Sequence, residues 1–585
     1  MVFLKSILHI KFNILIILFL ISIVKLIRLG VVPHDHVWED FQMYQIIDNF
    51  NNYTVDLFSV KLIPIAGPIL QYLFQYIYDI PFAHLLIGFS SQFLVCCLLF
   101  LITFKYSQNE LISIICCCSM MFIIPSFIDS NPNVWNFENI PASSRELFLS
   151  FREISKLICL LSILFYLEKQ KLLSVLLLSI NFFNHPTNTI NVFILILSSD
   201  IFISLSSNKK SMKNFYYYSI FLIPVLIRIV MFKTADFNSE QISFKEHWGN
   251  AVMNEPDDWS TLFAATSQVY SITRLKYGAL LIISIFILFI GKREDNSRKI
   301  VIGKLFLIII PTFTTLLALY EKYFFSYFPD FLNDFIMVLQ PKRSWGIIPI
   351  IGLPITIKFL YDILKLELMF KRLIIKERYF QYLLVFLFSI PSTVHGIKKG
   401  HLDQISQLLN LNKQRPYYFY NITKKNPYFY GQDKSALNEE ELIEISSYHD
   451  VCNYINKNTS ETSSFIYSPV LKDFRYLSGR QGFCGEKNDG NYAGLNRSFA
   501  SRYYEQIFIL TGLSYDQLEE PMYQGGENYR LLNQGFLSLE EDKIIEIAAK
   551  YNGYEYFITE IGHKHKLNFE VEYANSNYLI YKINK

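Results

Sequence analysis

Two adjacent carboxylates, Glu39 and Asp40, follow the first long apolar segment of the chain, and Asp35 lies shortly before them. The spacing of Phe41 and Tyr44 behind them predicts an amphipathic helix at a surface. Carboxylates at the start of a helix stabilise its N-terminus. Alternatively, they can act as a general base, or hold a metal ion, in a transfer reaction at a membrane face. The residue types alone leave both interpretations open.

A second group of candidate residues lies at the ends of later apolar segments. It consists of Arg343, Arg152, Arg145 and His185. A guanidinium group is a planar, permanently charged fork that fits a phosphate, so the arginines are candidates for binding a phosphorylated substrate. Each position also has a structural alternative. Arg145 and Arg343 can extend to the membrane interface, Arg152 can pair with Glu153, and His185 can simply end a helix.

The composition indicates that these residues belong to a membrane protein. Of the 585 residues, 51% are hydrophobic and only 18% are charged, whereas soluble domains are about 25% charged. The net charge of +3 gives no indication of nucleic-acid binding. The sequence contains no P-loop, GxGxxG, HExxH or CxxC pattern, so neither nucleotide hydrolysis nor a structural metal site is indicated.

Long apolar runs concentrate before residue 392. A helix that crosses a bilayer needs about 17–25 such residues, and the sequence predicts about eleven transmembrane helices. They are 12–29, 83–104, 110–128, 148–167, 171–184, 189–206, 215–232, 276–291, 301–320, 345–362 and 378–392. Segment 57–78 is interrupted by Pro64, Gly67 and Pro68, which predicts an interfacial or re-entrant pair of helices instead.

Lys and Arg lie in every second loop, and such loops are typically cytoplasmic. The N-terminus is therefore predicted inside, and the C-terminus outside. The predicted external loops are 29–82, 129–147, 233–274 and 321–344. Lys25 and Arg28 follow the first apolar core, which favours an uncleaved span over a signal peptide. We expect a transmembrane domain over 1–395 and an external domain over 396–585.

The predicted external domain alternates helical stretches with short β-type runs such as 464–467 and 578–581. This alternation predicts an α/β fold. Arg475 and Arg480 can recognise a phosphate or carboxylate there, or can hold the domain together through backbone contacts. Cys452 and Cys484 can form one disulfide in an oxidising compartment, although the sequence does not show that they are close.

The residues Glu39-Asp40-Phe41, with Tyr44 and Asn49-Phe50, resemble the acidic first-loop motif of the GT-C glycosyltransferases. These are polytopic membrane enzymes that take sugars from polyprenyl-phosphate carriers. The interrupted segment 57–78 resembles their second juxtamembrane helix. Three further stretches resemble uncharacterised bacterial GT-C-like membrane proteins: 184–187, 340–345 and 474–480. Glu39 stands where the family commonly has Asp.

The resemblance implies a GT-C-like enzyme of the bacterial inner membrane. It would transfer a sugar from a polyprenyl-phosphate donor to a glycan or lipid acceptor of the cell envelope, on the external face. Asp40 would be the base, with Glu39 and Asp35 behind it, and a divalent cation is the cofactor to consider. The assigned donor-phosphate residues are Arg343, Arg152, Arg145 and His185, and the assigned acceptor residues are Arg475 and Arg480. The alternatives are a flippase or transporter of lipid-linked sugar, and an inactive envelope-assembly scaffold.

Overall fold

The computed structural model describes only part of the chain. The described residues are 10–29, 81–123, 151–206, 216–234, 280–288, 298–323, 346–364, 377–398, 439–471, 474–483, 497–514, 526–551, 553–563 and 567–583, with Tyr327, Leu402 and Gln517.

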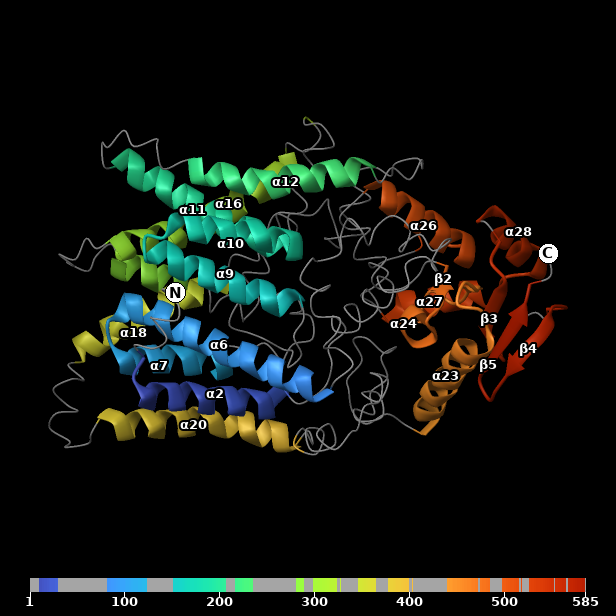
Figure 1. Cartoon of the computed structure of the whole chain (residues 1–585), viewed down its shortest axis with the longest axis horizontal. Coiled ribbons are helices and arrows are strands. Elements are labelled where there is room, and N and C mark those ends of the chain that lie inside the picture. Colours follow the sequence, from blue (N-terminus) through green and yellow to red (C-terminus); the bar gives the residue numbers. More distant parts are fainter. Residues whose placement is uncertain are drawn as a thin grey trace.

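The N-terminal part is a bundle of helices that lie side by side (Figure 1). Its helices are α2 (Phe12–Leu29), α6 (Pro81–Ser107), α7 (Glu110–Cys118) with the π-helical η4 (Ser119–Ile123), α9 (Phe151–Leu167), α10 (Lys171–Asn184), α11 (Pro186–Ser206), α12 (Tyr216–Thr234), α16 (Arg298–Tyr323), α18 (Ile348–Ile363) and α20 (Glu377–Lys398). A further helical segment covers 280–288. Each of the eleven predicted segments overlaps one of these helices.

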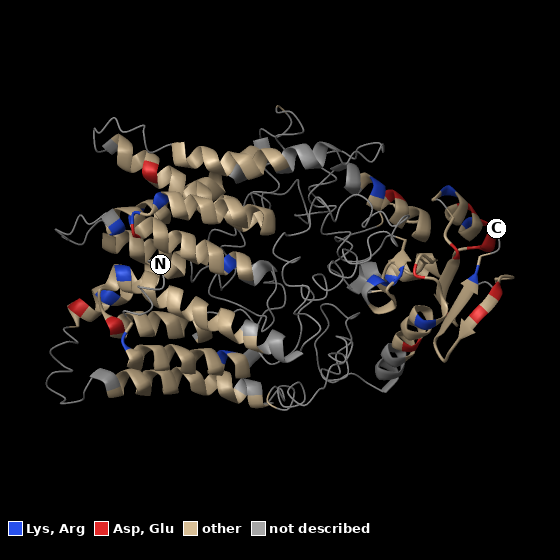
Figure 2. Cartoon of the chain, in the orientation of Figure 1, with Lys and Arg blue, Asp and Glu red and all other residues tan. Residues whose placement is uncertain are grey.

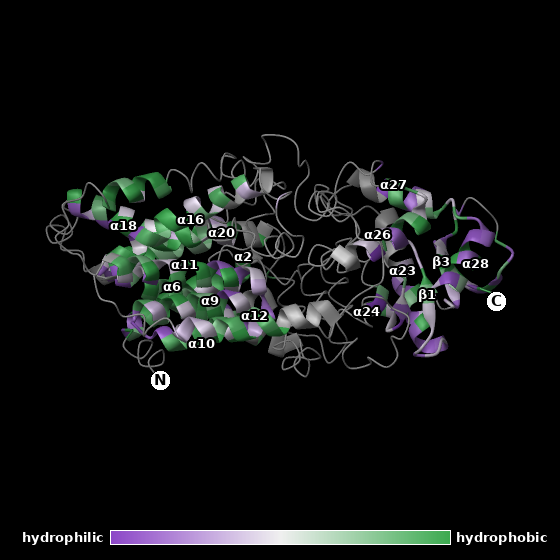
Figure 3. Cartoon of the chain, turned by 90° about the horizontal axis from the view of Figure 1, so that it is seen from above, coloured by the Kyte–Doolittle hydropathy of each residue, from purple (hydrophilic) through white to green (hydrophobic). Residues whose placement is uncertain are grey.

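The bundle helices are apolar on their outer as well as their inner faces (Figure 3). For example, the exposed fractions of Leu226, Ile282 and Phe386 are 60%, 69% and 62%. Helices that are apolar all round suit a lipid environment. Within the described residues, three helical stretches are long and apolar enough to cross a membrane: Phe89–Ser107, Pro186–Leu205 and Lys299–Leu316. The membrane character is therefore supported, whereas the count of eleven spans stays a prediction.

Helix α6 packs against α2, α7, α9 and α18. Helix α16 also approaches α6 closely at Gly303. A Cβ atom at this position would lie 2.9 Å from Cε1 of Tyr106 in α6, so a larger residue would not fit without a shift. The six cysteines of the bundle are all buried and free: Cys96, Cys97, Cys116, Cys117, Cys118 and Cys159. They fill the helix contacts as small apolar residues.

Ion pairs between helix ends define one end of the bundle. Lys11 pairs with Glu110 at 2.8 Å, Lys105 pairs with Glu168, and Lys171 pairs with Asp200. These contacts join the start of α2 to the start of α7, the end of α6 to the end of α9, and the start of α10 to α11. We call this the charged end. Figure 2 shows most charged residues of the bundle gathered there, away from the C-terminal part of the chain.

The C-terminal part is an α/β unit that lies beyond the opposite end of the bundle (Figure 1). Its strands are β1 (Ser464–Ile466), β2 (Gln481–Gly482), β3 (Tyr556–Glu560), β4 (Glu570–Ala574) and β5 (Tyr578–Lys582), and its helices are α23 (Glu439–Asn458), α24 (Phe474–Ser478), α26 (Arg497–Thr511), α27 (Gly526–Phe536) and α28 (Glu541–Lys550). The sheet has the order β2-β1-β3-β5-β4. Strand β1 runs parallel to β2 and β3, and β5 runs antiparallel to β3 and β4.

Alternation of side chains along the strands builds an apolar core on each face of this sheet. Ile466 and Phe557 lie in one core with residues of α26, α27 and α28. Phe465 and Ile558, their neighbours in sequence, lie in the other core with residues of α23 and α24. Successive strand residues point to opposite faces, so helices cover both sides. The α/β expectation for this part of the chain is confirmed within the described residues.

Candidate functional site

Most of the predicted site residues lie outside the described residues. This holds for the carboxylates Asp35, Glu39 and Asp40, for Arg145 and Arg343, and for Cys484. Arg152 lies in helix α9, but its side chain is not among those described. The roles assigned to these residues stay predictions. Cys452 is buried in the core on the α23 side of the sheet, and its predicted disulfide with Cys484 stays a prediction.

His185 forms the break between α10 and α11. Its backbone is extended, with φ −150° and ψ 89°, and its N–H donates to Asn181 O at 2.7 Å. Pro186 follows as the first residue of α11, a position where the missing N–H costs nothing. The ring Nδ1 of His185 accepts the Asn188 N–H at 3.3 Å, which caps the new helix. In this geometry Nδ1 carries no proton, so a neutral ring holds its proton on Nε2.

A dense group of buried polar side chains surrounds this break. From 181 to 191 the buried polar residues are Asn181, Asn184, His185, Thr187, Asn188, Thr189 and Asn191. The amide Nδ2 of Asn181 donates to Thr189 Oγ1 at 2.8 Å and to Ser155 Oγ of α9 at 3.0 Å. Thr189 Oγ1 in turn donates to His185 O at 2.7 Å. Asn181 therefore fastens both sides of the break to the neighbouring helix.

Two lysines are buried in the same half of the bundle. Lys156, beside Ser155 in α9, is 4% exposed, and Lys25 in α2 is 1% exposed. The ammonium group of Lys25 donates to Met121 O of the π-helix η4 at 3.4 Å. Buried ammonium groups are costly in an apolar bundle and usually mark functional positions, and single π-helical turns often occur at such positions.

Helix direction places these groups at one end of the bundle. Lys25 lies late in α2 and Lys156 lies early in α9, whereas the charged end holds the start of α2 and the end of α9. Helix α10 starts at the charged end with Lys171 and ends at His185. The polar break and both lysines are therefore in the half of the bundle that is nearer the C-terminal sheet (Figure 1).

Sequence patterns contain a signal for this group that the predictions above did not use. Asn181 and Asn184 before the break, and Asn188 and Asn191 after it, are each three residues apart. Such spacing places residues on one helix face. The residues of α9 that accept hydrogen bonds from Asn181 are Ser155 and Cys159. Sequence spacing could not identify them, because these contacts depend on how α9 packs against α10.

Arg475 and Arg480 are both buried within the C-terminal unit. The guanidinium of Arg480 donates to Asn456 O and Thr459 O, both at 2.8 Å, and to Thr459 Oγ1 at 3.1 Å. These acceptors lie at the end of α23, so Arg480 satisfies its last carbonyl groups. Arg475 Nη2 donates to Gly482 O at 3.5 Å. The contacts agree with the structural alternative, and an acceptor-binding role for either arginine stays a prediction.

A chain of polar side chains lies where parallel strands β1 and β3 end. Ser468 Oγ donates to Asn533 Oδ1 at 2.8 Å, and Asn533 Nδ2 donates to Glu560 Oε1 at 3.0 Å. Ser468 follows β1, Glu560 ends β3 and Asn533 belongs to α27. The carboxyl ends of parallel strands are the usual ligand-binding edge of α/β sheets. The sequence analysis missed this group because its members are 65 and 27 residues apart in sequence.

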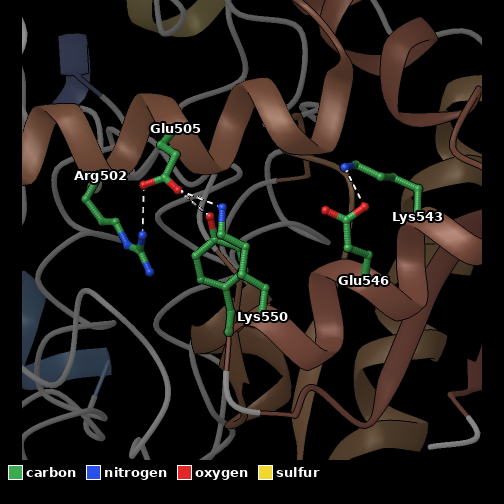
Figure 4. A network of polar contacts seen from close by, with 6 residues as sticks. Arg502, Glu505, Lys543, Glu546 and Lys550 are labelled. Carbon is green, nitrogen blue, oxygen red and sulfur yellow. Dashed lines mark hydrogen bonds and ion pairs between the residues drawn. The ribbon is translucent and has the colours of Figure 1, made fainter. Parts of the chain in front are cut away.

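A second network joins α26 to α28 (Figure 4). Glu505 accepts from Arg502 Nη1 at 2.8 Å, Lys550 Nζ at 3.0 Å and Tyr551 OH at 2.9 Å. Burial raises the pKa of Glu505, but these three donors outweigh it and hold the pKa below its usual value. This arrangement is that of a structural clamp. Among the described residues, no group of three or more His, Cys, Asp or Glu side chains is placed to hold a metal ion.

Comparisons with known proteins give little further information. No protein-family model matches the sequence, and no curated protein matches it either. Among solved structures, the chain is similar to the apo form of the oligosaccharyltransferase of Archaeoglobus fulgidus, with a TM-score of 0.45 and 10% sequence identity. The alignment covers 95% of this chain and 70% of that one. At this level of similarity, no activity follows from the neighbour.

Proposed function

We propose that this chain is a membrane glycosyltransferase of the GT-C type. It transfers a sugar from a polyprenyl-phosphate donor to a glycan or lipid acceptor of the cell envelope, on the external face of the bacterial inner membrane. In this proposal all eleven predicted segments cross the membrane, the N-terminus is cytoplasmic, and residues 396–585 form the external domain. The observation that carries the proposal is the cluster of buried polar side chains at the 181–191 break, which is fastened to Ser155 beside the buried Lys156, in one half of an apolar bundle.

An apolar helix bundle with buried ammonium groups suits a lipid-linked anion. The polyprenyl chain of such a donor partitions into the membrane, and its phosphate is an anion that a buried ammonium group can stabilise. Lys156, next to Ser155 and therefore beside the break, would stabilise this phosphate, and Lys25 of α2 is a second candidate. The amide and hydroxyl groups of Asn184, Asn188 and Thr187 offer donors and acceptors of the kind that bind sugar hydroxyls.

The proposed transfer forms one bond and breaks one bond. The acceptor hydroxyl oxygen attacks the anomeric carbon while Asp40 takes its proton, and the bond from that carbon to the phosphate oxygen breaks. The carrier phosphate leaves with the electron pair. The guanidinium groups of Arg343, Arg152 and Arg145 would balance the charge that develops on it, and His185 would donate a hydrogen bond to it from Nε2. A carboxylate with a pKa near 4 is a weak base, so Asp40 would need partial burial to raise its pKa.

The carboxylates of the predicted first external loop could bind a divalent cation instead of acting as a general base. Glu39 and Asp40, with Asp35 close by, supply the oxygen ligands that a divalent cation prefers. In this version the cation would sit on the donor phosphate. Omission of divalent cations, or addition of a chelator, distinguishes the general-base mechanism from the metal-dependent one. Transfer activity should persist in the first case and be lost in the second.

Transfer in liposomes tests the proposal directly. The purified protein receives a labelled polyprenyl-phosphate sugar and a crude envelope acceptor. Label should move to the acceptor, and Asp40→Asn should abolish the transfer. The matched control is Asp362→Asn, which removes a carboxylate that is 48% exposed and pairs with Lys358 one helical turn away.

The competing functions give different outcomes in the same liposomes. A flippase moves the labelled donor across the bilayer unchanged, with or without Asp40→Asn. An envelope scaffold neither moves nor transfers the label. Either outcome contradicts the glycosyltransferase.

A further inference from the structure

Two lysines at the charged end of the bundle have no ion-pair partner among the described residues. Lys169 lies in the turn between α9 and α10, and Lys299 lies at the start of α16. Three acidic groups among the described residues of this end are already paired: Glu110 with Lys11, Glu168 with Lys105 and Asp200 with Lys171. Beyond these three pairs, Lys169 and Lys299 add two positive charges.

The unmatched lysines lie near one another. Lys299 lies one helical turn before Gly303, which packs against Tyr106, the neighbour of Lys105 in α6. Lys105 in turn pairs with Glu168, which precedes Lys169 in the α9–α10 turn. The charges of Lys105, Glu168 and Lys169 all act on Lys299. Three ammonium groups therefore surround one carboxylate, which leaves a local charge of about +2. Mutual repulsion of like charges is unfavourable, especially since the Lys105 side chain is only 24% exposed. An additional anion would relieve this repulsion.

The backbone fixes the position of Lys169. Its φ of +64° lies in the left-handed region, which is uncommon for residues other than glycine. The tight turn is held by hydrogen bonds from Lys169 N to Tyr166 O at 3.1 Å and from Gln170 N to Phe165 O at 2.8 Å. The side chain of Lys169 is exposed, so it is available to an external ligand.

We propose that Lys105, Lys169 and Lys299 bind the phosphate of an anionic membrane lipid at the charged end of the bundle. The adjoining surface is apolar: Leu172 and Leu173, which follow the turn, are 42% and 39% exposed. This surface favours a lipid over free phosphate, because acyl chains can cover it while the headgroup contacts the lysines. Basic groups between helix ends are a recurrent way to bind anionic headgroups.

The proposal does not depend on the transfer reaction, because the polar break and the buried lysines are in the opposite half of the bundle. A variant that loses lipid binding here should keep its transferase chemistry in lipid-saturated membranes. Failure of one proposal therefore leaves the other standing.

Lipid titration of the full chain tests it. The protein in neutral detergent is titrated with phosphatidylglycerol, and bound lipid is counted by native mass spectrometry. Each lysine near an anionic surface contributes about 1 kcal/mol, so the Lys169→Gln, Lys299→Gln double variant should bind about 30-fold more weakly. The control double variant Lys358→Gln, Lys543→Gln removes the same charge from residues with local acidic partners, and it should bind like the wild type.

Two results would overturn the lipid site. One is equal phosphatidylglycerol affinity in the wild type and the Lys169→Gln, Lys299→Gln variant. The other is thermal stabilisation by inorganic phosphate as large as that by the lipid, which would show that the lysines bind phosphate without a lipid. Phosphatidylcholine, whose headgroup is neutral overall, should bind equally to all variants.

Discussion

The hydroxyl group of Tyr166 donates a hydrogen bond of 2.8 Å to Oδ1 of Asp200, across two helices. The second oxygen of this carboxylate accepts from Tyr218 OH at 2.7 Å and pairs with Lys171. One carboxylate, only 3% exposed, therefore joins α9, α10, α11 and α12. Every partner donates to it, so the ionised form is fully satisfied.

Substitution of Asp200 should destabilise the bundle strongly. Asp200→Asn keeps the size of the side chain but leaves the ammonium of Lys171 without its charged partner. Breaking a buried ion pair typically costs about 3–5 kcal/mol. Thermal unfolding in detergent measures the loss, and Asp362→Asn, an exposed pair, should cost about 1 kcal/mol or less. Equal unfolding temperatures for the two variants would contradict the four-helix clamp.

Arg480 should stabilise the end of α23 through its hydrogen bonds and not through its charge alone. Arg480→Lys keeps the positive charge but cannot reproduce the planar fork that reaches Asn456 O and Thr459 O together. Each charge-assisted hydrogen bond contributes about 1.5–3 kcal/mol, so we expect a loss of about 3 kcal/mol. Hydrogen exchange should show faster opening of the last turn of α23. A variant that is as stable as the wild type, yet binds acceptor poorly, would instead support the ligand-binding role.

Most helices and strands could be located from the sequence, because apolar runs and β-type runs of neighbouring residues determine where they form. Apolar runs predict each bundle helix, and the β-type run 464–467 predicts β1, whose residues Phe465 and Ile466 enter opposite cores. Strand β2 was missed. It has two residues, Gln481 and Gly482, and only its pairing with β1 makes it a strand. The sequence predicts helical stretches over 436–458 and 540–551, and the ends of α23 and α28 differ from these by three residues or fewer.

The candidate site was less predictable because contacts between distant residues build it. The gap between the predicted segments 171–184 and 189–206 contains the break, and a helix-end role for His185 was among the alternatives. Its connection to Ser155 through Asn181 depends on how α9 packs against α10. Asp40, Glu39 and Asp35 lie outside the described residues, so their roles stay predictions.

His449 in α23 should make the C-terminal unit sensitive to acid. Burial lowers the pKa of His449 from 6.5 to about 4, against the opposing effect of Asp450. The folded pKa is below the unfolded one, so the stabilisation is complete above pH 6.5 and is lost as the pH falls from 6.5 towards 4. The shift corresponds to roughly 3 kcal/mol. His449→Gln, which cannot titrate, should remove this part of the pH dependence of unfolding, and an unchanged profile would contradict the assignment.

Asn181 should control the placement of His185, and through it the proposed transfer. Asn181→Leu removes the donors to Thr189 and Ser155, and it leaves buried acceptors unsatisfied at a cost of about 1–3 kcal/mol. The matched control is Ser162→Ala, which breaks a hydrogen bond of 3.0 Å between the same two helices, α9 and α10, but involves Ser174, near the charged end. Initial rates at varied donor concentration should show a several-fold higher KM in Asn181→Leu only. Equal KM values in two variants of equal stability would contradict the positioning role and limit Asn181 to holding the helices together.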